Sequence, residues 1–196
     1  MIQRLLLTTL LFSFLASPAG AGTISGEVTS SKGKVSEMQG YVVVWLDGAT
    51  AGSPPSSMPV MSQSGVQFSP RVMTVTVGQT VSFPNEDDVA HNVFSLSSAN
   101  KFKLGIYPKG DTREVKFEKP GVIDLFCSIH RHMHAVIIVT PNQYVAQSEL
   151  GKPFKIENVP AGDYTLKVWN AAHKVVEQKV TVPASGEAKV AVALQD

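Results

Sequence analysis

The sequence of 196 residues is short of cysteine and of charge. Its single cysteine is Cys127, which excludes any disulfide within one chain. Charged residues make up only 17% of the chain, and the formal net charge is +1. A nucleic-acid-binding protein usually carries a large excess of lysine and arginine over acidic residues. This sequence has no such excess, with 17 lysine and arginine residues against 16 acidic ones. We therefore expect neither a disulfide scaffold nor a nucleic-acid partner.

The sequence also lacks the motifs of common enzyme classes. It has no glycine-rich phosphate-binding loop and no Ser-His-Asp set in a recognisable context. Asp87 and Asp88 could indicate carboxylate catalysis or a calcium loop, but a turn accounts for them more simply. We therefore expect that the protein is not an enzyme.

The N-terminus has the pattern of a secretion signal. Arg4 is followed by an apolar stretch from Leu5 to Leu15, and Ala19-Gly20-Ala21 has the small residues of a cleavage site. The apolar stretch is too short to span a membrane comfortably. We predict a signal peptide over residues 1–21, a periplasmic protein and no membrane span after cleavage. A lone cysteine outside the cytosol indicates a reactive thiol, an intermolecular bridge or a metal ligand.

The remainder of the chain has the pattern of an all-β protein. Short runs rich in β-branched and aromatic residues alternate with Gly, Pro, Asn and Asp, which is typical of a sandwich or barrel. These runs are Val42–Leu46, Met73–Val77, Val81–Phe83, Val122–Phe126 and Ala135–Val139. We expect at most a short helix, within residues 142–150.

Two changes in composition divide the chain. Residues 49–59 (ATAGSPPSSMP) have the composition of a linker or long loop, and a second break falls near residues 141–152. We predict a central domain over residues 49–141 that is inserted into a small second β-sandwich made of residues 22–48 and 142–196. The alternative is a single enlarged sandwich.

The flanking segments carry a resemblance of their own. The turn Pro160-Ala161-Gly162-Asp163 lies between Ile156 and the alternating Tyr164-Leu166-Val168. This pattern resembles the carboxypeptidase regulatory-like domain, which implies a β-sandwich without catalytic residues.

The strongest chemical signal is the segment Cys127-Ser128-Ile129-His130-Arg131-His132-Met133. It places a thiolate, an imidazole and a thioether between two strands, and His91 offers a second imidazole. Two imidazoles and a thiolate with a weak axial thioether are the donors of a blue-copper site. Zinc could use His91, Cys127 and His130, but the thioether of Met133 is a poor zinc donor.

These motifs resemble the cupredoxins, amicyanin above all, from about Met58 to Pro141. His91-Asn92-Val93 is similar to the first-ligand motif of that family, and Cys-x2-His-x2-Met to the short ligand loop of amicyanin. The resemblance implies a Greek-key β-sandwich or barrel with one type 1 copper held by His91, Cys127, His130 and Met133. It also implies that the Asn92 side chain fastens the ligand loops together.

The ligand loop departs from the family pattern. Ile129 stands where many members have proline, and three basic or imidazole side chains crowd the loop: Arg131, His132 and His134. They could form a docking surface or a second metal site, or they could simply be solvated.

The resemblance implies a periplasmic electron carrier similar to proteins of methylamine utilisation. It would exchange single electrons with c-type cytochromes or a dehydrogenase, and His130 would be the exit. The alternative is a copper-binding protein for delivery or sequestration without rapid electron transfer. A copper nitrite reductase or multicopper oxidase is less compatible. Such enzymes resemble fused cupredoxins with additional His-x-His elements for further coppers, whereas this chain has one cupredoxin-sized segment and five His in all.

Overall fold

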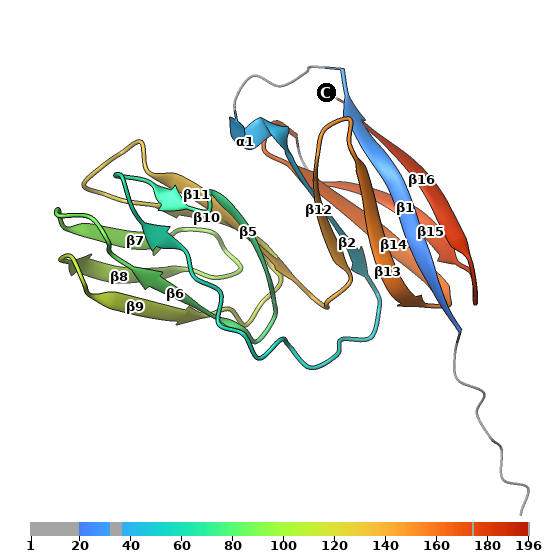
Figure 1. The fold of residues 1–196 in the computed structure, drawn as a ribbon, viewed down its shortest axis with the longest axis horizontal. Coiled ribbons are helices and arrows are strands. Elements are labelled where there is room, and N and C mark those ends of the chain that lie inside the picture. The colour runs from blue at the N-terminus through green and yellow to red at the C-terminus, as the bar shows by residue number, and fades with distance from the viewer. Residues whose placement is uncertain (1–19, 32–36, 174, 196) are drawn as a thin grey trace, which may run out of the picture.

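A computed structural model describes residues 20–31, 37–173 and 175–195. The predicted signal peptide lies outside the described residues, apart from Gly20 and Ala21. The described residues form two β-sandwiches that lie side by side, as Figure 1 shows. Among these residues, we find no helix with the length and apolar character needed to cross a membrane.

The central sandwich is built from the middle of the chain. Its strands are β3 (Ser62–Gln63), β4 (Phe68–Ser69), β5 (Val72–Thr76), β6 (Thr80–Pro84), β7 (His91–Ser95), β8 (Phe102–Tyr107), β9 (Thr112–Lys116), β10 (Gly121–Phe126) and β11 (His134–Thr140). One sheet has the order β5-β11-β10-β7-β8, and β6 pairs with β9 opposite it. A buried core that includes Phe83, Ile123, Leu125 and Ile137 fills the space between them. The all-β fold class predicted from the sequence is therefore confirmed.

The flanking sandwich combines both ends of the chain. Its strands are β1 (Ala21–Ser30), β2 (Tyr41–Asp47), β12 (Val145–Glu149), β13 (Pro153–Pro160), β14 (Gly162–Asn170), β15 (Val176–Val182) and β16 (Glu187–Leu194). The sheet β13-β1-β16 faces the sheet β12-β2-β14-β15 across a second apolar core. The helix expected within residues 142–150 is absent, because that stretch forms β12 as an edge strand against β2. The helix that the structure does contain is α1 (Glu37–Gly40).

A third apolar cluster joins the two sandwiches. On β2, alternate residues face opposite ways, so that Val44 packs into the flanking core whereas Trp45 packs toward the central sandwich. On β11, Ile137 packs into the central core and Val136 packs toward the flanking sandwich. Both strands are thus buried on both faces, which explains why each is a continuous apolar run in the sequence.

The chain leaves the flanking sandwich and returns to it at adjacent positions. Trp45 on β2 is directly opposite Val145 on β12, and the amide of Leu46 donates a hydrogen bond to the carbonyl oxygen of Tyr144 over 3.0 Å. The Asn142 side-chain amide also donates to the carbonyl oxygen of Leu46 over 2.9 Å. Strands β2 and β12 therefore pair as the two arms of a β-hairpin, and the whole central segment forms the connection between them.

We expect a chain in which a short Gly-Ser linker replaces residues 49–141 to fold into a β-sandwich, because the β2–β12 pairing does not need the central segment. It should be less stable than the flanking sandwich in the full chain, because Trp45 and Trp169 are then no longer buried against the central sandwich. Amide dispersion in NMR spectra and thermal unfolding followed by circular dichroism measure both effects. As a control, Trp45→Thr should destabilise the full chain and leave the shortened one almost unchanged. A shortened chain without dispersed amide signals would favour the single enlarged sandwich.

Candidate metal centre

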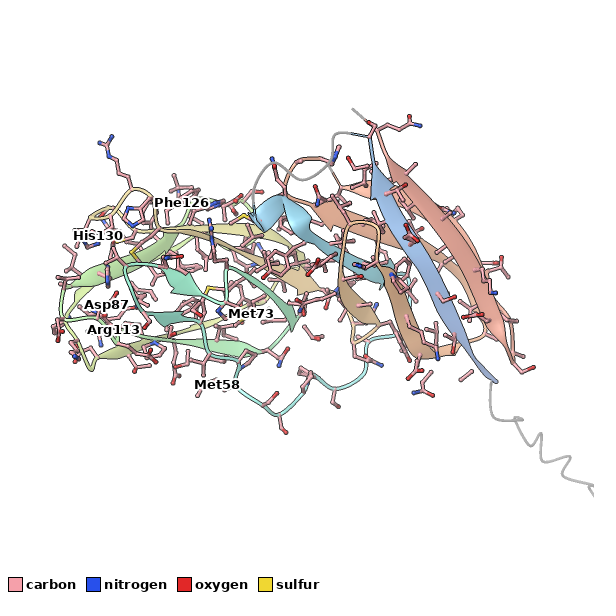
Figure 2. All side chains as sticks on the ribbon, turned by 45° about the horizontal axis from the view of Figure 1, so that its top comes forward. Met58, Met73, Asp87, Arg113, Phe126 and His130 are labelled. Carbon is pink, nitrogen blue, oxygen red and sulfur yellow. The ribbon has the colours of Figure 1, made fainter. Side chains whose placement is uncertain are left out.

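Three of the four predicted ligands come from one end of the central sandwich. His91 is the first residue of β7, Cys127 directly follows the last residue of β10, and His130 lies in the loop that leads to β11. Neighbouring strands β7 and β10 pair through Phe94 and Phe126, which brings their ends together. Figure 2 shows His130 at the end of the central sandwich that is remote from the flanking sandwich.

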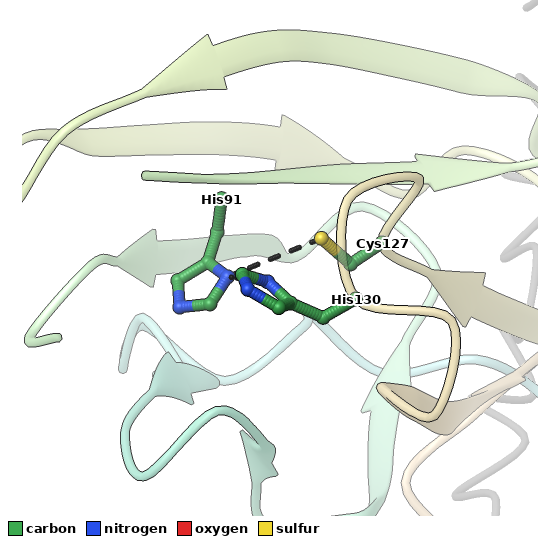
Figure 3. A group of neighbouring side chains, drawn as sticks. All are labelled: His91, Cys127 and His130. Carbon is green, nitrogen blue, oxygen red and sulfur yellow. Dashed lines mark hydrogen bonds between the residues drawn. The ribbon is translucent and has the colours of Figure 1, made fainter. Parts of the chain in front are cut away.

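The donor atoms of these three residues converge. The His91 Nδ1 atom lies 3.0 Å from the His130 Nδ1 atom and 4.0 Å from the Cys127 Sγ atom. One ligand atom from each residue lies within 4.8 Å of the others. Figure 3 shows the three side chains pointing toward one another. His91 is fully buried and Cys127 is buried, whereas His130 is half-buried. One ion could therefore bind all three, with His130 nearest to solvent.

Met133 completes the candidate set. It is buried in the central core, and its backbone amide donates a hydrogen bond to the carbonyl oxygen of His130 over 3.0 Å. This turn fixes the spacing between the second imidazole and the thioether. Met133 therefore belongs to the same loop as Cys127 and His130 and to the same buried cluster as Cys127.

Asn92 fastens the ligand loop to β7. Its side-chain carbonyl oxygen accepts hydrogen bonds from the backbone amide of Ser128 over 2.8 Å and from the hydroxyl of Ser128 over 3.2 Å. Asn92 is itself buried. Asn92, which follows the ligand His91, thus holds Ser128, which follows the ligand Cys127. This is the contact that the sequence resemblance implied.

The loop that precedes His91 is held by a buried amide. Asn85 donates hydrogen bonds from its side chain to the carbonyl oxygens of Val89 and Tyr107, and its own side-chain oxygen accepts from the amide of Asp87. The Tyr107 hydroxyl donates to the carbonyl oxygen of Phe83, and burial raises the pKa of Tyr107 to about 12. Tyr107 therefore stays neutral and structural at physiological pH.

The turn that the sequence predicts at Asp87 does not fully account for this residue. Asp87 does lie in a turn, but its Oδ2 atom is also 2.8 Å from the Nε2 atom of His91. Burial raises the pKa of the Asp87 carboxyl, but the amide of Val66, the His91 ring and the amide of Gly65 outweigh it and hold the pKa below its usual value. The sequence signal was available, since Asp87 precedes the ligand by four residues, but nothing in the sequence shows that the loop folds back.

The structure separates the other residues of the ligand loop from the convergent group. His132 is exposed, and its Nε2 atom donates to the carbonyl oxygen of Val66 over 3.1 Å. His134 lies 2.9 Å from Asp124 through its Nε2 atom and stacks on Phe126. Arg131 is exposed. Among the described residues, the one group of three metal-ligating side chains is His91, Cys127 and His130.

The chemistry of the donor set fits copper. A thiolate and a thioether are soft donors that favour Cu(I), and imidazole binds both oxidation states. The Nε2 atom of His91 is occupied by Asp87, so its Nδ1 atom is left to face the other ligands. The residues present would therefore hold copper, and Met133 argues against zinc.

A comparison with protein families matches the central part of the chain. Residues 56–140 match the model of the copper binding proteins of the plastocyanin/azurin family. No curated protein matches the chain.

Solved structures show partial similarity to the chain. A copper-containing nitrite reductase from Thermus scotoductus is 30% identical over 47% of this chain, with a TM-score of 0.41. The match covers only 24% of that enzyme. A purple cupredoxin from Nitrosopumilus maritimus is 26% identical over 42% of this chain and 99% of its own, with a TM-score of 0.38. A reduced mutant of amicyanin is 20% identical over 49% of this chain and 97% of its own, with a TM-score of 0.40.

Proposed function

We propose that the protein is a type 1 copper protein that carries single electrons between periplasmic redox partners, since residues 56–140 match the model of the plastocyanin/azurin family of copper binding proteins. The observation that supports this most directly is the convergence of His91 Nδ1, His130 Nδ1 and Cys127 Sγ, with Met133 buried in the same core cluster as Cys127. Bound copper would supply the one-electron couple between Cu(II) and Cu(I).

The chain itself supplies a rigid and largely dry site. Hydrogen bonds from Ser128 to Asn92 hold the Cys127 loop, and the turn from His130 to Met133 holds the rest of it. A site that is fixed before binding needs little rearrangement when an electron arrives or leaves. Such a site favours fast electron transfer over storage of the metal.

The exit for the electron would be the edge of His130. This side chain is half-buried, whereas His91 is fully buried, and the adjacent Ile129 is 44% exposed. A partner that packs on this end of the central sandwich comes close to the copper ligand that solvent reaches most easily. We propose that the partners are c-type cytochromes or a dehydrogenase, and the predicted signal peptide supports a periplasmic location.

The test is an optical spectrum of the copper-loaded protein with the metal content measured on the same sample. We expect one copper per chain and an intense blue absorption that a mild reductant bleaches, because the Cys127 thiolate donates charge to Cu(II). Stopped-flow mixing of the reduced protein with an oxidised c-type cytochrome should then restore the blue colour. A colourless one-copper protein would contradict the type 1 site. Several coppers per chain with slow electron exchange would favour delivery or sequestration, and turnover of nitrite or oxygen would show an enzyme.

A further inference from the structure

Asp87 contacts a proposed copper ligand and belongs to a loop outside the ligand motif. Its Oδ2 atom lies 2.8 Å from the Nε2 atom of His91, whose side chain is fully buried, and only 14% of the Asp87 side chain is exposed. An ionised carboxylate can only accept hydrogen bonds. Nε2 of a neutral His91 must therefore carry the proton and donate it, which leaves Nδ1 as the lone-pair atom that faces Cys127 and His130.

The turn between β3 and β4 holds the carboxylate in this position. The backbone amide of Gly65 donates to Asp87 Oδ1 over 2.6 Å, and the amide of Val66 donates to Asp87 Oδ2 over 2.9 Å. Successive amides that point into one concavity form an anion-binding nest. The two amides of the nest bind both oxygens of the Asp87 carboxylate. Oδ2 can accept a second hydrogen bond, and His91 lies in position to donate it.

The backbone of this turn has positive φ angles at both central residues, as a two-residue hairpin turn of type I′ does. Gly65 has a φ of 65° and Val66 has a φ of 57°. A β-branched residue seldom adopts this left-handed conformation, because its side chain crowds the backbone there. The hydrogen bond to Asp87, the packing of the Val66 side chain on the central core and the bond from His132 to the Val66 carbonyl oxygen stabilise this conformation. The same turn thus contacts Asp87 on one side and the ligand loop on the other.

We propose that Asp87 is a positioning residue that fixes the tautomer of His91 and lowers the reduction potential of the copper site. This inference rests on the proposed function. A carboxylate that accepts from the second nitrogen of a metal-bound imidazole orients the ring and raises its basicity. Its negative charge also stabilises Cu(II) more than Cu(I), since the attraction grows with the charge of the ion. The loss of Asp87 therefore weakens Cu(II) binding more than Cu(I) binding.

The test compares Asp87→Asn with Asp88→Asn in the copper-loaded protein. The two variants remove the same charge from neighbouring positions, but Asp88 is 90% exposed and pairs with Lys109 over 2.6 Å. For Asp87→Asn we expect Cu(II) affinity to fall by roughly 10–100-fold, which is typical of lost outer-shell partners. We expect the ratio of Cu(I) to Cu(II) affinity to rise about tenfold, which corresponds to about 59 mV in the potential of a one-electron couple. Asp88→Asn should change both quantities far less.

A measurement on the copper-free wild-type protein tests the tautomer without any variant. Long-range 1H–15N NMR spectra at mildly alkaline pH distinguish the protonated ring nitrogen of His91 from the unprotonated one. We expect the proton on Nε2, and the Nδ1-protonated form would contradict the positioning role. This measurement tests the tautomer even if Asp87→Asn does not fold.

The outcomes separate this inference from the proposed function. If wild type is blue and the two variants shift its potential equally, the type 1 assignment stands and the specific role of Asp87 is refuted. If wild type is not blue, the proposed function fails, and the His91 tautomer still shows whether Asp87 sets the ring. A larger shift for Asp87→Asn in a blue protein supports both.

Discussion

Replacement of Cys127 by serine is expected to abolish the blue colour of the copper-loaded protein completely. The colour requires charge transfer from a thiolate sulfur to Cu(II), and a serine hydroxyl cannot supply it. Cys127 is buried beside His91, and serine is nearly isosteric with it, so the fold should persist. Visible absorption of the copper-loaded variant measures the loss, and far-ultraviolet circular dichroism verifies the fold.

Ser128→Ala is the matched control for this experiment. It removes the hydroxyl bond to Asn92 but leaves the backbone amide bond and the Cys127 thiolate in place. This variant should stay blue with at most a modest shift of the absorption maximum. A blue Cys127→Ser protein would show that sulfur from Cys127 does not bind the copper.

A charge placed at Val136 is expected to separate the two sandwiches. Val136 is buried in the cluster between them and lies directly opposite Asp124 on β10. In Val136→Asp, burial of an unpaired polar group costs roughly 2–7 kcal/mol, and the two facing carboxylates repel each other. Because the side chain points away from the central core, the copper site should keep its colour while the contact between the sandwiches is lost.

Tryptophan fluorescence measures this separation directly. The chain has two tryptophans, Trp45 and Trp169, and both lie in the cluster between the sandwiches. In Val136→Asp we expect their emission to shift to the red below the unfolding temperature, and calorimetry should show two transitions in place of one. Val136→Ala removes about 2 kcal/mol of apolar burial without a charge, so it should keep the wild-type emission. Wild-type emission in Val136→Asp would mean that the cluster does not hold the sandwiches together.

The strands and the ligand set were within reach of sequence analysis. The predicted runs Val42–Leu46, Val81–Phe83, Val122–Phe126 and Ala135–Val139 lie within β2, β6, β10 and β11, because β-branched and aromatic residues favour a pleated, buried surface. Cys127 and His130 are close in the sequence, so their proximity in space needs only a tight loop. His91 was found because its residue type completed a known donor set.

At two places the structure is decided by long-range pairing that the local pattern does not show. The segment with β12 has little strand character of its own, and it is a strand because β2 offers it a free edge. His134 was grouped with the ligand loop by sequence proximity, but it is the first residue of β11, where it pairs with Asp124 and stacks on Phe126. In both cases the deciding partner lies on another strand.

The sequence by itself determined the all-β class, the donor chemistry and the residues that carry that chemistry, since these depend on residue type and short spacing. The tertiary structure alone decided which nitrogen of His91 faces the other ligands, because that choice depends on Asp87 and on the turn at Gly65 and Val66. It also decided that the two sandwiches share a buried cluster around Trp45, since alternation along β2 and β11 shows two apolar faces but not what covers them. The physical reason is the same for both: the local pattern of a segment can show that a side chain or a face is buried, but it does not show which other segment it contacts.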